Sequence, residues 1–425
     1  MNVEPSPCSA PARDDARGPL SGRTALIVHP AWHSCGSHQV FVSQAAAYRA
    51  LGARVLTLAL ADAPGAVAGS RAQKAYDAAT RDLSADRRFY SGMALARVLQ
   101  PSFLAATRRW LHGDFASMLA TTARLSPIPA GLDAEERIDF IHCNHFFCMP
   151  AALEVARRRG AKIALDTHDL QARQYALRNE RGWTVPPAAR FDDMLAIELA
   201  LLARADALIH LNDEEAASFK MLLPKSRHEL IYPAVPEIAP GPGGPDLIVV
   251  ASANYANFLG VKWMIEEVLP RAPEARIKIY GNIDQEFRAR APALSRARPE
   301  LFLGRVADLA AAYDRAAAVL LPTTEGHGVS IKTIEAMSAG APLIATPHAF
   351  RGMQLDPARL TNVTLAPDAE SFAAALRQAA ANGARGEDRA ASDTRRAYEA
   401  HFAFEAYAAA LARVALSLIP TDRHI

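Results

Sequence analysis

The sequence of 425 residues has little cysteine, almost no net charge and no long uninterrupted apolar run. Its four cysteines are too few for a disulfide framework in a chain of this length, so we expect a reducing compartment. Lysine and arginine number 47 against 45 aspartates and glutamates, a formal net charge of +2. That balance offers no global electrostatic reason to expect nucleic-acid binding.

Membrane and export signals are also missing. The first twenty residues carry charges and prolines and lack the apolar run of a signal peptide, so we expect a disordered tail over 1–20. No uncharged apolar stretch approaches the roughly 20 residues of a membrane-spanning helix. These observations predict a cytoplasmic protein.

What the sequence does contain is apolar runs that alternate with helical patterns. Hydrophobic residues make up 50% of the chain, enough to fill two or three domain cores. Uninterrupted apolar runs between helices are typical of parallel sheets covered on both faces, so we expect an α/β fold with two Rossmann-like domains. The runs that predict strands are 24–28, 54–60, 138–142, 162–165, 207–211, 247–251, 277–280, 301–303, 318–321 and 342–345.

A segment rich in proline and glycine divides these runs and predicts a linker over 237–246. We expect an N-terminal domain over 21–236 with a helical insertion at about 71–124, and a C-terminal domain over 247–392. A helix and tail would follow over 393–425. Because open parallel sheets bind ligands beyond the carboxyl ends of their strands, the loops after strands should hold the chemistry, in a cleft between the domains.

The most informative loop follows the predicted strand 318–321. Gly326 and Gly328 let the backbone approach a ligand, and the helix that begins just after them directs its free N–H groups to the same place. Lys332 adds a positive charge for phosphate oxygens. Glu335, three residues later on the same helical face, suits a vicinal diol.

Two phosphate-binding motifs are excluded at this loop. A P-loop needs glycine directly before its Lys-Ser/Thr pair, where this chain has Ile331. The dinucleotide fingerprint needs three glycines at the first strand of its domain, and this loop lies late in its domain. An ordinary turn with a solvated lysine is the alternative interpretation.

The stretch from Gly326 to Thr346 resembles the donor loop of the GT-B retaining glycosyltransferases of family 4, the glycogen-synthase-like group. The match runs G-x-G-x-x-x-K-x-x-E-A-M-x-x-G-x-P-x-I-x-T. The resemblance implies that Lys332 binds the diphosphate of a nucleotide-sugar donor and that Glu335 binds the ribose, with His327 and Val329 beside them. The family's usual pair of glutamates is separated by seven residues. Here nine residues lie between Glu325 and Glu335, so the role of Glu325 stays open.

Three further segments resemble the family in the expected order. The loop before the first helix of the C-terminal domain holds Asn254 and Asn257, and Asn257 either faces phosphate or caps the helix. Gly281 and Arg305 end later elements, and the segment 303–313, which contains Arg305, is the family's usual nucleobase site. The resemblance therefore adds Asn257, Gly281 and Arg305 to the donor site.

In the N-terminal domain the resemblance implies that Gly36 and Ser37 lie against the donor sugar and phosphate. His168, in a His-Asp pair after a predicted strand, would contact the sugar or the reacting phosphate, a task suited to imidazole near neutral pH. A structural histidine is the alternative. The His142–Cys148 cluster lacks a second downstream ligand pair, so we predict no metal site and no cofactor.

The resemblance implies a glycosyltransferase that moves a sugar from a nucleotide-diphosphate donor to an acceptor hydroxyl with retention, in surface polysaccharide or glycolipid synthesis. Catalysis would rest on His168 and Lys332, and the acceptor would be a saccharide or lipid-linked saccharide. Arginines of the insertion and of 157–159 suggest weak peripheral contact with the inner face of a membrane. The alternatives are a catalytically inactive nucleotide-sugar-binding protein, and an epimerase or phosphorylase of the same fold.

Overall fold

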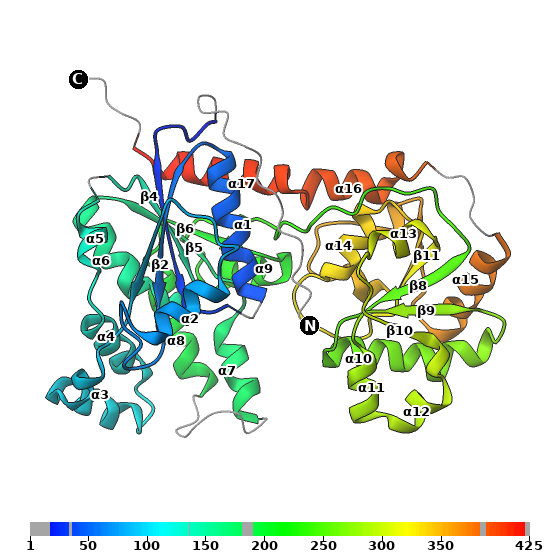
Figure 1. The fold of residues 1–425 in the computed structure, drawn as a ribbon, viewed down its shortest axis with the longest axis horizontal. Helices are drawn as coiled ribbons and strands as arrows, with labels where there is room; N and C mark the ends of the chain where they lie inside the picture. The colour runs from blue at the N-terminus through cyan, green and yellow to red at the C-terminus, as the bar shows by residue number, and fades with distance from the viewer. Residues whose placement is uncertain (1–17, 34–35, 136, 181–189, 383–387, 421–425) are drawn as a thin grey trace. The chain divides into compact units, whose positions relative to one another are not determined.

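The computed structural model describes residues 18–33, 36–135, 137–180, 190–382 and 388–420. The chain divides into two compact units (Figure 1). The N-terminal unit comprises Pro7–Pro233 together with Tyr407–Ile425, and the C-terminal unit contains Ala234–Ala406. None of the described helices combines the length and the apolarity needed to cross a membrane.

The N-terminal unit is built on a seven-stranded sheet in the order β3-β2-β1-β4-β5-β6-β7, with every pairing parallel. Its central strands are almost fully buried and mostly apolar, as a sheet covered on both faces requires, and they also bury polar residues such as His29, Asn144 and Asp166. The strands are β1 (Thr24–Pro30), β2 (Arg54–Leu60), β3 (Arg87–Ser91), β4 (Phe140–Asn144), β5 (Lys162–Asp166), β6 (Ala207–His210) and β7 (His228–Leu230).

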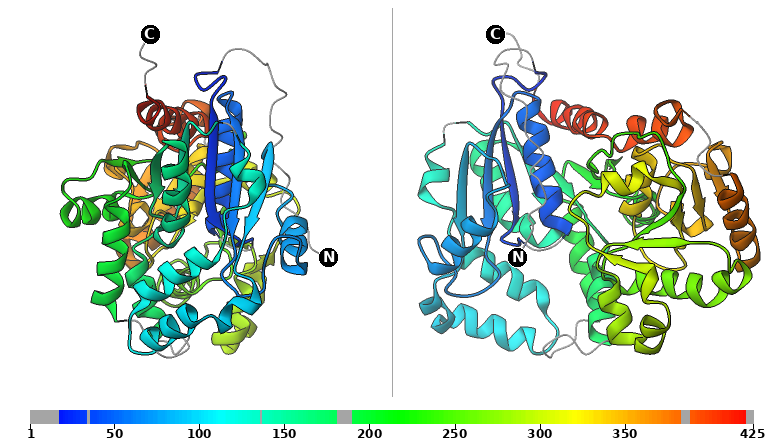
Figure 2. Two further views of the ribbon diagram at one scale, coloured as in Figure 1. Left: turned by 90° about the vertical axis from the view of Figure 1, so that its left-hand side faces the viewer. Right: turned by 45° about the vertical axis from the view of Figure 1, so that its right-hand side comes forward.

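Helices cover this sheet on both faces, with α1 on one side and α5 and α6 on the other (Figure 1). Figure 2 shows α3 and α4 gathered at one end of the unit in both of its views. The helices are α1 (Gly36–Ala50), α2 (Arg71–Ala79), η1 (Leu95–Leu99), α3 (Pro101–Trp110), α4 (Phe115–Leu125), α5 (Ala130–Asp133), η2 (Phe146–Cys148), α6 (Met149–Arg159), α7 (Gln171–Glu180), α8 (Phe191–Leu202), α9 (Asp213–Leu222) and α17 (Phe404–Leu418).

The C-terminal unit has a six-stranded parallel sheet in the order β10-β9-β8-β11-β12-β13. The strands are β8 (Asp246–Val250), β9 (Ile277–Tyr280), β10 (Phe302–Gly304), β11 (Ala316–Leu321), β12 (Leu343–Ala345) and β13 (Val363–Leu365). The helices are α10 (Tyr255–Trp263), η3 (Met264–Val268), η4 (Leu269–Arg271), α11 (Asp284–Arg290), α12 (Pro292–Ala297), η5 (Pro299–Leu301), α13 (Ala310–Asp314), α14 (Ile331–Ser338), η6 (Pro347–Phe350), η7 (Pro357–Arg359), α15 (Ala369–Asn382), η8 (Arg389–Ala391) and α16 (Asp393–His401).

Each unit has its own apolar core, as two folding domains require. In the N-terminal unit, buried residues of β1, β2, β4, β5 and β6 pack against α6 and α8. In the C-terminal unit, β8, β9 and β11 pack against α10, η3 and α15. The expected α/β fold with two parallel-sheet, Rossmann-like domains is confirmed, and all ten predicted strands are present within a few residues of their expected positions.

The structure also departs from the sequence-based expectations. The segment 71–124 is not wholly helical, because Arg87–Ser91 forms edge strand β3. Of the expected tail 1–20, residues 1–17 lie outside the described residues, whereas Leu20 is fully buried and its N–H donates to the carbonyl of Leu51. The helical pattern at 393–418 forms two helices, α16 and α17, which are separated at the buried Phe402.

Candidate active site

The carboxyl ends of β4 and β5 hold a buried polar network. The Nε2 atom of Gln44, from α1, lies 2.9 Å from Asn144 Oδ1 and 3.2 Å from Asp166 Oδ2. Asn144 Nδ2 donates in return to Gln44 Oε1 at 2.9 Å. Asn144 and Asp166 end their strands at paired positions, so the parallel register brings them together. Side chains that the strands and α1 fix from three directions form a rigid support for the residues that follow.

Two histidines follow these strands on strained backbone. His145 has φ +65° and His168 has φ +57°, and they are the only non-glycine residues with positive φ in the described part of the chain. Such conformations cost a histidine on the order of 1–3 kcal/mol and are concentrated at functional sites. The two rings stack at 3.9 Å with an interplanar angle of 11°. The fold therefore holds both imidazoles in one place at an energetic cost.

The two imidazoles differ in their hydrogen bonds. His168 Nε2 lies 2.9 Å from the amide oxygen of Asn144, which can only accept, so Nε2 carries a proton. Burial, with smaller contributions from the neighbouring His145 and His142, lowers the pKa of His168 well below its ordinary value. Burial lowers the pKa of His145 to about 3, and neither of its ring nitrogens has a partner among the described residues. Both rings are thus neutral at pH 7.

Asp166 carries the network's acidic group. Its Oδ1 accepts the backbone N–H of His168 at 3.0 Å, which fixes the turn that presents the imidazole. Burial raises the pKa of Asp166 to about 7, an effect that the hydrogen bonds from His168 and Gln44 partly offset. Asp166 therefore ionises much less readily than an ordinary aspartate.

Two more buried carboxylates fix the loop after His168. Glu198, from α8, accepts the backbone N–H groups of Gln171 at 3.0 Å and Ala172 at 2.8 Å. Glu215, from α9, accepts the N–H of Leu170 at 3.2 Å. Because these carboxylates satisfy the free N–H groups at the start of α7, the loop is held without help from a ligand.

Gly36 and Ser37 form the first turn of α1, the helix that carries Gln44 further along. A Cβ at Gly36 would meet no atom within 4 Å, so this turn is open to an incoming group. No contact described in the structure joins either residue to His168. The pair is consistent with a helix N-terminus available to an anion.

In the C-terminal unit the loop between β11 and α14 adopts glycine conformations. Gly326 has φ +131° and Gly328 has φ +67°. A Cβ at Gly326 would lie 2.7 Å from Nη2 of Arg351, which also lies 3.5 Å from the carbonyl oxygen of His327. His327 is itself exposed, and Val329 is half-buried. The loop therefore requires glycine and presents its backbone beside a guanidinium group.

Lys332 and Glu335 lie together at the start of α14. Lys332 Nζ is 2.9 and 2.7 Å from the two carboxylate oxygens of Glu335. Both side chains are partly accessible, with 28% and 17% of their surfaces exposed. The Ser330 hydroxyl caps the helix by accepting the N–H of Thr333. The predicted placement of Lys332 and Glu335 on one helical face is what the structure has.

Gly281 and Asn257 are placed by the ends of β8 and β9. Gly281 has φ +110°, and a Cβ there would lie 2.0 Å from the carbonyl oxygen of Ala251, so no other residue fits. Asn254, rather than Asn257, caps α10 by accepting the N–H of Asn257. The Asn257 side chain donates to the carbonyl of Ser252 at 3.0 Å.

Two other candidates lie in exposed positions. Arg305 follows β10 and is exposed, and Glu325 is exposed in the glycine loop. No contact described in the structure joins Arg305, Gly281 or Asn257 to Lys332. The structure thus pairs only Lys332 with Glu335 and leaves the remaining predicted donor residues as separate loop positions of the same unit.

An apolar pocket of about 530 Å³ opens at the carboxyl ends of β1, β2 and β3, where it is closed by α4 and η2. Its wall includes Trp32 and Phe147, which contact His145 with ring centroids 5.1 and 5.0 Å away. The histidines and the pocket are therefore neighbours. Nothing in the sequence analysis predicted this cavity, because its walls come from segments far apart in the chain.

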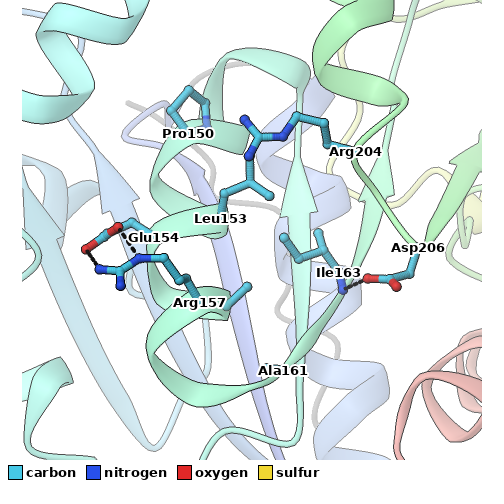
Figure 3. Close-up of a pocket in the computed structure, with 9 residues that line it drawn as sticks. Pro150, Leu153, Glu154, Arg157, Ala161, Ile163, Arg204 and Asp206 are labelled. Carbon is cyan, nitrogen blue, oxygen red and sulfur yellow. Dashed lines mark hydrogen bonds and ion pairs between the residues drawn. The ribbon is translucent and has the colours of Figure 1, made fainter.

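A second pocket, of about 520 Å³, lies at the amino ends of β5 and β6 (Figure 3). Three of the four charged side chains that line it have partners within the protein. Arg157 pairs with Glu154, and Asp206 accepts the backbone N–H of Ile163 at 2.9 Å. Because ligands of parallel sheets bind at the opposite edge, this pocket is not a candidate site.

Sequence reasoning missed Gln44, and it placed Asn144 or His145 only as residues that line the cleft, in the loop after the predicted strand 138–141. Gln44 is fully buried on a helix whose buried residues, apart from His38, are otherwise mainly alanine and aromatic residues, and such a polar residue among apolar ones was the available signal. His142, part of the cysteine–histidine cluster, is bonded to the Tyr48 hydroxyl at 2.8 Å. Within the described residues, no group of three or more histidine, cysteine or acidic side chains is placed to hold a metal ion.

Comparison with known proteins gives two family matches that together span most of the chain. Residues 36–234 match the glycosyl transferase 4-like domain, and residues 244–382 match the glycosyl transferases group 1 domain. No curated protein matches the sequence.

Several solved structures share the fold. Sucrose-phosphate synthase from Thermosynechococcus elongatus aligns over 93% of this chain and 99% of its own, with 17% identity and a TM-score of 0.59. HepE from Anabaena, in complex with UDP, aligns over 93% and 100%, with 15% identity and a TM-score of 0.61. The pneumococcal O-GlcNAc transferase GtfA, in complex with UDP and GlcNAc, aligns over 94% and 99%, with 11% identity and a TM-score of 0.57.

The two parallel sheets are the architecture of the GT-B fold, and the two domain matches fall one on each side of the proline-rich segment. The chain therefore belongs to the group 1 glycosyltransferases, family 4, and is an enzyme of the GT-B fold.

Proposed function

We propose that the enzyme transfers a sugar from a nucleotide-diphosphate donor to an acceptor hydroxyl, and that the donor binds in the C-terminal unit. One observation carries this proposal: the Lys332–Glu335 pair at the start of α14, directly after a loop that only glycine can form. A helix N-terminus, a lysine and open backbone together favour a diphosphate.

Each side chain of the proposed donor site has one task. Lys332 neutralises the leaving diphosphate, with the N–H groups of α14 adding to its positive charge. Glu335 accepts hydrogen bonds from the two ribose hydroxyls and meanwhile holds the ammonium of Lys332 in place. Gly281 and Asn257 line the donor from the ends of β8 and β9, and Arg305 lies toward the base.

The N-terminal unit supplies the groups near the transferred sugar. His168, with its proton fixed on Nε2 by Asn144, presents the unprotonated Nδ1 of a neutral imidazole as a hydrogen-bond acceptor for a sugar hydroxyl. Gly36 and Ser37, in the open first turn of α1, direct backbone N–H groups to a phosphate.

The reaction we propose retains the anomeric configuration. The bond between the anomeric carbon and the diphosphate oxygen breaks, and a bond to the acceptor oxygen forms on the same face. The acceptor's proton passes to the departing diphosphate, which therefore serves as the base. We place this reaction in surface polysaccharide or glycolipid synthesis, with contact at the inner face of a membrane.

The solved relatives support a nucleotide-sugar donor. HepE from Anabaena has structures in complex with UDP and with UDP-glucose. GtfA has a structure with UDP and GlcNAc. Sucrose-phosphate synthase and a trehalose-phosphate synthase from Burkholderia vietnamiensis, described as UDP-forming, share the fold.

Replacing Lys332 by alanine tests the donor site. Loss of a charge-stabilising donor typically costs 10²–10³ in turnover, so we expect a drop of about that size with intact folding. The matched control is Lys262→Ala, which removes a comparable lysine–glutamate pair from helix α10. Release of nucleoside diphosphate from a panel of nucleotide sugars measures turnover.

The same assay also shows which results would exclude the proposed donor site and the proposed retention. A Lys332→Ala enzyme that turns over as fast as the Lys262→Ala enzyme would exclude this donor site. The anomeric configuration of the product, from its ¹H coupling constant, tests retention, and an inverted product would exclude the front-face mechanism.

A further inference from the structure

The apolar pocket beside the histidines has a lining with few hydrogen bonds to offer. It is bounded by aromatic and aliphatic side chains, among them Trp32, Trp110, Phe115, Leu119 and Phe147. A volume of about 530 Å³ falls within the ordinary range for small-molecule sites.

The lining has few polar side chains, among them Asp62, Ser126 and Tyr175, and several of its polar groups already have partners. The Ser91 hydroxyl donates to the carbonyl of Pro127 at 2.8 Å. The Thr122 hydroxyl lies 3.6 Å from the sulfur of Met118, and Trp32 Nε1 lies 3.4 Å from Asp62. A sugar ring buried here would leave most of its hydroxyls without partners, at a cost that excludes it. An apolar chain meets no such cost.

Two aromatic side chains of the pocket wall also contact the strained histidines, which do not themselves line the pocket. Trp32 and Phe147 form part of its wall and also pack against His145, whose ring stacks on His168. A molecule with an apolar chain in the pocket is therefore one aromatic side chain away from the imidazoles. His145 is buried behind that wall, and its two ring nitrogens have no partner among the described residues, so it offers the hydrogen bonds that a polar head needs.

The segment of η1 and α3, which contributes Trp110 to the pocket wall, has leucines that are unusually exposed. Leu95, Leu99, Leu104 and Leu111 have between 54% and 75% of their surfaces exposed. Arginines 108 and 109 occupy the last turn of α3 among them. Exposed leucines interspersed with cations favour contact with an anionic lipid surface, where an alkyl chain is available to the pocket.

We infer that the acceptor of this enzyme carries an alkyl chain, which the pocket between α4 and the ends of β1–β3 holds while its polar head lies against His145. The inference rests on the proposed transfer to an acceptor hydroxyl and names the acceptor's chemical class: a lipid rather than a free saccharide. It also makes His145 an acceptor-binding residue beside His168.

The binding test uses methyl, hexyl, octyl and decyl maltoside below their micelle concentrations, titrated into the full-length enzyme by calorimetry. Each buried methylene is worth roughly a fourfold gain in affinity, so binding should tighten steeply with chain length. Affinity that does not change from methyl to decyl would overturn the inference. This series needs no variant, so a folding defect cannot obscure it.

Two phenylalanine substitutions on one helix locate the binding. Ala123 of α4 lines the pocket, whereas Ala120, one turn away on the same helix, is exposed. Ala123→Phe fills the space of several methylenes and should weaken decyl maltoside binding by about tenfold or more, while Ala120→Phe should not. Equal binding of decyl maltoside by the two variants would show that the alkyl chain does not bind in this pocket.

A transfer assay tests whether the bound lipid is the acceptor of the sugar. With labelled donor and a membrane lipid extract, we expect label in the organic phase, lost in Ala123→Phe and kept in Ala120→Phe. Label found only in water-soluble saccharide, made equally fast by both variants, would overturn the inference. Binding of nucleoside diphosphates is measured on the same samples, and its absence would instead refute the proposed donor function.

Discussion

The strained backbone at His145 predicts that a glycine variant is more stable than an alanine variant, the reverse of the usual order. Replacing this residue by alanine or by glycine removes the same buried ring, so the lost packing cancels in the comparison. What differs is the backbone, because φ +65° with ψ +145° lies where alanine is strained and glycine is not.

The size of the difference follows from two opposing contributions. Relief of a left-handed conformation is worth about 1–2 kcal/mol to glycine. The greater freedom of glycine in the unfolded chain costs it about 0.5–1 kcal/mol. The His145→Gly protein should therefore be more stable than His145→Ala by about 1 kcal/mol. At an ordinary helical position, alanine is the more stable residue by a similar amount.

Equilibrium urea unfolding of both variants measures this difference. Ala120→Gly on α4, against the wild-type protein, gives the ordinary order as a control, since Ala120 is exposed within a helix. We expect both His145 variants to lose transfer activity, because the imidazole is absent from each. If His145→Ala equals or exceeds His145→Gly in stability, then the left-handed backbone is not a feature of the folded enzyme.

Three further predictions concern the same two sites. Because burial raises the pKa of Asp166 to about 7, its contribution to stability is complete below about pH 4 and lost as the pH rises through 7. The free energy of unfolding of the wild type should thus fall relative to Asp166→Asn, by at most about 3 kcal/mol, when urea unfolding is repeated from pH 5 to 8. Gly281→Ala should destabilise the C-terminal unit by about 3 kcal/mol or more, measured by thermal unfolding, because its Cβ would collide with the Ala251 carbonyl. Ser330→Ala should cost about 1 kcal/mol through loss of the α14 cap, and a change below 0.2 kcal/mol in urea unfolding would argue against that cap.

The periodic features of the sequence predicted the fold because they are local. Buried strands such as Thr24–Pro30 are continuous apolar runs, and burial on both faces of a parallel sheet requires that pattern. Edge strand β3 escaped prediction because its arginines need not be buried. Arg87 bonds Glu135, and Arg88 bonds the carbonyl of Thr80, at the rim of the sheet.

The donor loop was more predictable than the histidine site for a similar reason. Gly326, Lys332 and Glu335 lie within one strand–loop–helix unit, so spacing alone places the lysine and the glutamate on one helical face. The support of His168 comes instead from Gln44 and Asn144, which are distant in sequence and meet only through the sheet. No local pattern encodes such a meeting, nor the positive φ of His145.

Nucleotide binding tests the proposed donor site most directly. We would measure the thermal stability of the wild type and of Glu335→Ala with UDP, GDP and ADP, and use Glu266→Ala, from the exposed pair on α10 and η3, as the control. A ligand at a hundred times its Kd adds about 2.7 kcal/mol to folding stability. We expect one of these nucleotides to raise the thermal stability of the wild type and of Glu266→Ala, but not that of Glu335→Ala. Equal stabilisation of both variants, or none of the wild type by any nucleotide, would contradict the proposed donor site.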